Sequence, residues 1–90
     1  MTQRDNVVRL RRFWFSFEGL PPLSVLQLGC GVTAYTYDDA VRVLKDRVLG
    51  QSLPACSVVE DVDIRTLDEN QVRPNMGVVT LRGIWFPLGY

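Results

Sequence analysis

The side chains in this sequence best suited to chemistry form an acidic run, Glu60-Asp61-Val62-Asp63. In an extended strand, residues two apart point to the same side, so Asp61 and Asp63 would lie about 7 Å apart. Carboxylates at such spacing can bind Mg²⁺ or Ca²⁺, or act as a general acid and base. The run is also typical of a charged edge strand, where charge discourages pairing with other chains. We favour the edge strand, with an acid-dependent enzyme or a metal-binding domain as the alternative.

Other groups that carry catalysis are scarce in this chain. It has no histidine, which removes the commonest general base and the commonest metal ligand. Cys30 and Cys56 fit no zinc or redox motif and are too few for a disulfide scaffold. The glycines of GCGVTA, residues 29–34, match neither the dinucleotide fingerprint nor a phosphate-binding loop. We therefore expect no cofactor and no metal, and favour a protein without catalytic activity.

A group of arginines directly precedes a run of aromatic residues near the start of the chain. Arg9, Arg11 and Arg12 lead into Phe13-Trp14-Phe15, a combination found in single-strand nucleic-acid platforms. Ten basic residues balance ten acidic ones, however, so net charge provides no attraction to nucleic acid. Nucleic-acid binding is therefore the second alternative. The basic start and the acidic residues 60–69 are complementary, which predicts either neighbouring strands or one face offered to a partner.

The spacing of apolar residues predicts which elements position these groups. Ninety residues correspond to one domain, 1–90, with a single modest core. Thr36 is a suitable N-cap and Gly50 a suitable C-terminal stop for a helix. Alternation predicts strands at 7–18, 24–35, 56–65 and 77–86, and helical spacing predicts a helix at 37–49. The expected fold is α+β, a two-layer sandwich in ββαββ order with one helix on one face of a four-stranded sheet.

Two strand orders are compatible with this arrangement. A β-grasp-like order, 2-1-4-3, places the aromatic first and fourth strands in the centre and the acidic strand at an edge. A fully antiparallel order, 2-1-3-4, pairs the basic first strand with the acidic third strand, which satisfies charge across the strands. We prefer the first order, because FWFSF and GIWF both favour burial.

One helix can cover only one face of the sheet. We expect Leu28 to be buried under the helix, on the face formed by alternate residues of the second strand. Trp14 and Trp85 have the opposite parity to neighbouring apolar rows, so we expect them on the uncovered face. Exposed aromatic rings on a sheet are typical of association surfaces. In the competing arrangement, the connection 66–76 and the C-terminal tail fold over these rings.

These patterns predict a small non-catalytic interaction module, such as a regulatory or toxin-neutralising subunit. It would bind another protein, or itself as a homodimer, through a sheet face or edge. The chain has no apolar run near the ~20 residues that a membrane helix needs and no apolar run directly after its polar start. We therefore expect a cytoplasmic protein that does not bind membranes. The residues expected to contact the partner are Trp14, Tyr35, Leu81, Trp85, Glu60, Asp61 and Asp63.

Overall fold

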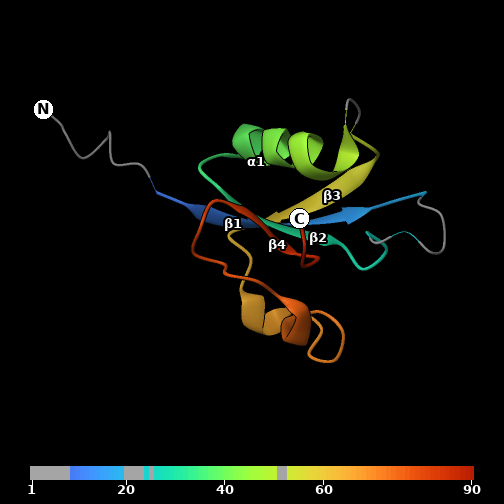
Figure 1. Ribbon diagram of the computed structural model, residues 1–90, viewed down its shortest axis with the longest axis vertical. Coiled ribbons are helices and arrows are strands. Elements are labelled where there is room, and N and C mark those ends of the chain that lie inside the picture. Colours follow the sequence, from blue (N-terminus) through green and yellow to red (C-terminus); the bar gives the residue numbers. More distant parts are fainter. Residues whose placement is uncertain (1–8, 20–23, 25, 51–52) are drawn as a thin grey trace, which may run out of the picture.

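Four antiparallel strands and one helix form the fold (Figure 1). The computed structural model describes residues 9–19, 24, 26–50 and 53–90. The strands are β1 (Arg11–Phe17), β2 (Cys30–Ala34), β3 (Cys56–Glu60) and β4 (Gly83–Phe86). Helix α1 (Tyr37–Leu44) continues into a π-helical turn, η2 (Lys45–Leu49), and two 3-10 turns, η3 (Ile64–Thr66) and η4 (Arg73–Asn75), precede β4. The predicted α+β class is confirmed, with the short helical turns added to the expected helix and strands.

The strand order in the sheet is β3-β1-β2-β4. The preferred β-grasp-like order 2-1-4-3 is therefore wrong, because β4 pairs with β2 and not with β1. The alternative order 2-1-3-4 correctly contains the β1–β2 and β1–β3 pairs but also misplaces β4. The acidic strand β3 is at an edge, as predicted. The apolar sequence of β4 predicts that both faces of the strand are buried, which favours a central strand. β4 is instead an edge strand whose two faces are covered by the two cores.

Each strand is shorter than the alternating pattern predicts. Before β2, the N–H of Leu26 donates to Ser24 Oγ and Gly29 has a φ of +117°, so residues 26–28 form a turn. Leu28 consequently has 45 % of its surface exposed, and the prediction that it is buried under the helix is wrong. The predicted start of the first strand at 7–8 and the loop at 20–23 lie outside the described residues.

The third and fourth strands are shortened by local contacts. Asp61 has a φ of +56°, which ends β3 one residue earlier, at Glu60. Ahead of β4, the hydroxyl of Thr33 donates to the carbonyl of Val79 at 2.6 Å, and the N–H of Gly77 donates to the carbonyl of Trp85 at 2.7 Å. These bonds hold residues 77–82 in a turn against the sheet, so only Gly83–Phe86 join the ladder.

The helix forms where its spacing and its caps predict. Thr36 Oγ1 accepts a hydrogen bond from the N–H of Asp39 at 3.0 Å, which satisfies one free donor of the first turn. Ala40, Val43 and Leu44 are buried, whereas Tyr37 is 36 % exposed. The buried face is thus rotated slightly from the apolar stripe that helical spacing predicts, Tyr37, Val41, Leu44 and Val48. It packs on Phe13, Phe15, Cys30, Val32 and Ala34 to form the first core.

Gly50 ends the helical segment, as predicted, and its positive φ of +74° lies in the range that favours glycine. A Cβ at this position would meet no atom within 4 Å, so the cost of a side chain is confined to the backbone. We expect Gly50→Val to lower the free energy of unfolding by about 1–3 kcal/mol in urea. The control is Asp46→Val, which places the same side chain on an exposed site in η2. Equal losses in the two variants would contradict the backbone explanation.

Candidate functional site

The second face of the sheet is covered, so the predicted exposed tryptophans are buried. The segment 61–82, with η3 and η4, lies against this face (Figure 1). Trp14 is 9 % exposed and Trp85 is 1 % exposed. They form a second core with Phe86, Val62 and Val72. The prediction of an uncovered aromatic face is therefore wrong, and the competing arrangement, in which the connection folds over the rings, is the one found.

Two glycines and an irregular strand pairing make room for these rings. An ideal Cβ on Gly29 would lie 2.5 Å from the Trp14 ring, and one on Gly31 would overlap the Trp85 ring. The β2–β4 register shifts between Gly31 and Val32, and such a bulge reorients side chains along a strand. As a result, the adjacent Trp85 and Phe86 both join the second core, while Ile84 packs against the first core. The ring centroids of Trp14 and Trp85 are 5.9 Å apart.

Asp61 and Asp63 of the acidic run do not lie side by side on one strand. Arg11 donates to Glu60 Oε1 at 2.8 Å and to both carboxylate oxygens of Asp61, at 3.0 and 2.8 Å. Asp63 instead caps η3 and pairs with Arg65 at 2.9 Å. Because β3 ends before Asp61, the expectation that Asp61 and Asp63 share one side of a strand is wrong. Glu60 and Asp61 thus pair with Arg11, and Asp63 pairs with Arg65.

The arginines stabilise the ionised form of Asp61 and Asp63. Hydrogen bonds from Arg11 lower the pKa of Asp61, and those from Arg65 lower the pKa of Asp63 to about 2. A general acid at neutral pH needs a raised pKa instead. Within the described ranges, no group of three or more acidic or cysteine side chains is placed to hold a metal ion. The lowered pKa values of Asp61 and Asp63 are therefore typical of carboxylates in structural ion pairs.

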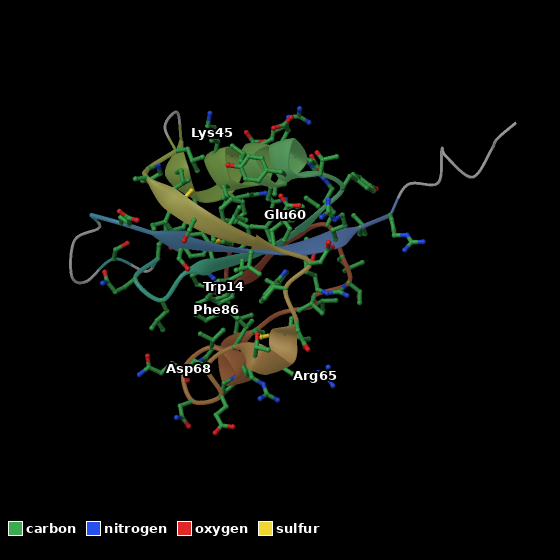
Figure 2. The ribbon with its side chains drawn as sticks, turned by 180° about the vertical axis from the view of Figure 1, so that it is seen from behind. Trp14, Lys45, Glu60, Arg65, Asp68 and Phe86 are labelled. Carbon is green, nitrogen blue, oxygen red and sulfur yellow. The ribbon has the colours of Figure 1, made fainter. Side chains whose placement is uncertain are left out.

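The open side of β3 is the clearest unused hydrogen-bonding surface. The N–H of Glu18 donates to the carbonyl of Ala55, which sets the alternation in the β1–β3 ladder. In an antiparallel pair, every second residue directs its N–H and C=O to the neighbour and the others direct them away. Ser57 and Val59 therefore face β1. Cys56, Val58 and Glu60 face away from it, toward the open side of the sheet. Figure 2 shows Glu60 on this edge strand, which is drawn in yellow.

A second surface surrounds a carboxylate that the sequence pattern did not single out. Asp39 is only 8 % exposed and accepts two hydrogen bonds from Arg82, at 2.9 and 2.5 Å. It also accepts from the N–H of Tyr35 at 3.1 Å. These bonds lower the pKa of Asp39 to about 2, with Arg82 as the main cause. Asp39 lies on the same helix face as the buried Val43, four residues later. This spacing is the feature of the sequence from which the burial of Asp39 could have been predicted.

Tyr35 and Leu81 flank this buried ion pair. Tyr35 is 44 % exposed and Leu81, next to Arg82, is 64 % exposed. The side chains of Tyr35 and Leu81 are therefore accessible, while those of Trp14 and Trp85 are not. Of the predicted partner-binding residues, Trp14 and Trp85 are buried in the second core. Tyr35 and Leu81 form an exposed surface beside the Asp39–Arg82 ion pair, which we call the Tyr35 corner. The acidic residues Glu60, Asp61 and Asp63 lie at the end of β3 and directly after it.

The thiols and the arginine-rich strand offer no reactive site. Burial raises the pKa of Cys30 to about 12 and, to a smaller degree, raises the pKa of Cys56. Both thiols are therefore protonated at neutral pH, which makes them poor nucleophiles. Phe13 and Phe15 are fully buried, so they cannot stack on bases. No pocket was found in the part of the chain that the structure describes.

The fold and these surfaces define a small α+β domain in which an antiparallel sheet is covered by a helix on one side and by a turn-rich segment on the other. Comparison of the chain with protein-family models, with curated proteins and with solved structures found no match in any of the three. Among the described residues, no helix is long and apolar enough to span a membrane.

Proposed function

We propose that the protein is a non-catalytic interaction module that binds another protein or a second copy of itself through the open edge of β3. The observation that carries this proposal is the outward row of backbone groups at Cys56, Val58 and Glu60. An extended segment can add to such an edge by main-chain hydrogen bonds. The strand lies at the end of the sheet order, so no described strand occupies this side.

Several features make this edge suitable for pairing. Natural edge strands are commonly protected by proline, lysine or a bulge within the strand. Cys56–Glu60 contains no proline and no lysine, and its pairing with β1 is regular. Val59 is 53 % exposed beside the backbone row. The carboxylates of Glu60 and Asp61 are held by Arg11, which offsets part of their charge.

The ion pairs favour this function over the two alternatives. A metal-binding or acid-dependent site would need Asp61 and Asp63 to converge, but they bind Arg11 and Arg65. Nucleic-acid binding through the first strand would need free arginines and exposed rings, whereas Arg11 is engaged and Trp14 is buried. Tyr35 and Leu81 provide a second, smaller surface for a partner. Two unpaired thiols, Cys30 and Cys56, support a cytoplasmic location, because reducing compartments keep thiols free.

The proposal is tested by replacing Val58 with proline. Val58→Pro removes an outward N–H and no bond to β1, and proline is tolerated on the open side of edge strands. Wild type and variant are used in parallel to capture proteins from the native host. We expect a protein retained by wild type to be lost with Val58→Pro and kept with Leu81→Ser. If the captured protein is lost only with Leu81→Ser, the interface is at the Tyr35 corner and not at the β3 edge. Retention by all three proteins would contradict an interface at either surface.

Calorimetry of the purified protein addresses the metal alternative. Micromolar binding of Mg²⁺ or Ca²⁺ in calorimetry, abolished by Asp61→Asn, would favour that alternative over the module.

A further inference from the structure

We infer that the partner of the β3 edge is a second copy of the chain, paired antiparallel about a twofold axis at Val58. This inference rests on the proposed function and specifies its partner. In this arrangement Val58 lies opposite its own copy, and Cys56 lies opposite Glu60 of the second copy. Each of the outward residues Cys56, Val58 and Glu60 then donates one hydrogen bond and accepts one. The two sheets become one continuous sheet.

The residues at the two ends of β3 select this register. An axis at Glu60 would place two carboxylates in directly opposite positions, and like charges directly opposite are destabilising. An axis at Cys56 would place Val58 opposite Pro54, which has no N–H to donate. An axis at Ser57 would place Glu60 opposite Pro54, and an axis at Val59 would leave the two Glu60 residues only about 7 Å apart along the strands. An axis at Val58 avoids all of these conflicts. It keeps the two Glu60 residues about 13 Å apart along the strands, beyond the ~8 Å Debye length at physiological ionic strength.

The side chains beside this axis are compatible with a close approach. Val58 is half-buried against the first core, and Val59 is exposed on the opposite face of the same strand. Branched side chains pack well across paired strands. Arg11 draws the carboxylates of Glu60 and Asp61 toward β1, on which Arg11 lies, and so away from the open side. The centre of the pair therefore holds no charged side chain, because Val58 lies opposite Val58 and Val59 lies opposite Ser57. Glu60 lies in the last pair at each end.

The size of the contact sets the expected strength. A ladder over Cys56–Glu60 buries less surface than the ~1,200–2,000 Å² of a standard stable interface. We therefore expect a dimer that dissociates on dilution, in equilibrium with the monomer. Val58→Pro removes one donor from each copy and should weaken the dimer by at least about tenfold.

Sedimentation equilibrium of the purified full chain over a range of concentrations tests the stoichiometry. Wild type should show a reversible monomer–dimer equilibrium, Val58→Pro should be monomeric, and Leu81→Ser should behave as wild type. Circular dichroism verifies that Val58→Pro remains folded. If that variant unfolds, Val59→Lys, which adds a charge beside the edge at an exposed site, replaces it. A strictly monomeric wild type would overturn self-pairing. The module itself would survive that result if the Val58-dependent capture of another protein persists.

Disulfide cross-linking tests the register. In a Cys56→Ser background, Val58→Cys places the two new thiols opposite each other, where the Cα separation of about 5.5 Å allows a disulfide. The matched control is Ser57→Cys in the same background, whose two thiols would be displaced along the strands beyond bonding distance. We expect oxidation to give a covalent dimer with Val58→Cys and little with Ser57→Cys. Preferential cross-linking of Ser57→Cys, or of native Cys56 to its copy in the otherwise unchanged chain, would overturn the Val58 axis.

Discussion

Replacing Trp85 by alanine should lower the free energy of unfolding by about 3–5 kcal/mol, the largest loss that we expect from any surface or core change discussed. The side chain is 1 % exposed and lies at the centre of the second core, beside Trp14 and Phe86. Its removal would leave a cavity under the segment 61–82, because Gly31 has no side chain to fill it. Urea unfolding, followed by tryptophan fluorescence of Trp14 and by circular dichroism, measures the loss.

Two companion variants separate packing from polarity. The Nε1 of Trp85 is the only buried side-chain nitrogen or oxygen in the described residues that has no hydrogen-bond partner. Trp85→Phe removes that unsatisfied donor while it keeps an aromatic ring, so its loss should be clearly smaller than that of Trp85→Ala. Leu81→Ala, at a site 64 % exposed, should change stability by less than about 0.5 kcal/mol. A comparable small change for Trp85→Ala would mean that the second core does not stabilise the fold.

Replacing Asp39 by asparagine should lower the free energy of unfolding by about 2 kcal/mol at neutral pH. Asp39 accepts two hydrogen bonds from Arg82 and one from the N–H of Tyr35, and bonds to charged groups contribute about 1.5–3 kcal/mol. The side chain of Arg82 is 41 % exposed, so the loss should be smaller than for a fully buried pair. Asp38→Asn is the matched control, because Asp38 is exposed in the same helical turn.

The same pair predicts a specific pH dependence. Arg82 lowers the pKa of Asp39 from its ordinary value of 3.8 to about 2 in the folded protein. A carboxyl whose pKa is lower in the folded state binds protons more readily when unfolded. Its stabilising contribution is therefore complete above about pH 4 and disappears as the pH falls through about 2. The stability difference between wild type and Asp39→Asn should shrink over this interval, measured by urea unfolding. A difference that is constant from pH 7 to pH 2 would contradict the ion-pair explanation.

Local patterns in the sequence determined the elements of this fold. Thr36, the helical spacing from Tyr37 and the positive φ of Gly50 each appear where the sequence predicts them, because capping and backbone preferences act over a few residues. The opposite faces of Phe13 and Trp14 follow in the same way from the alternation along a strand. The third strand lies at an edge, as predicted, although Glu60 is the one residue of the acidic run that belongs to β3.

The tertiary structure alone decided how these elements pair and what covers them. Alternation specifies two faces of a strand but not which strand lies beside it, so the position of β4 next to β2 could not be obtained from its sequence. The turn-rich segment 61–82 has no regular spacing, and it covers Trp14 and Trp85 through the long-range packing of Val62 and Val72 in the second core. Gly29 and Gly31 leave the space that the two rings occupy. The Asp39–Arg82 pair likewise joins residues that are 43 apart in the chain. Local preferences act between neighbours, whereas these contacts form only when the sheet brings distant residues together.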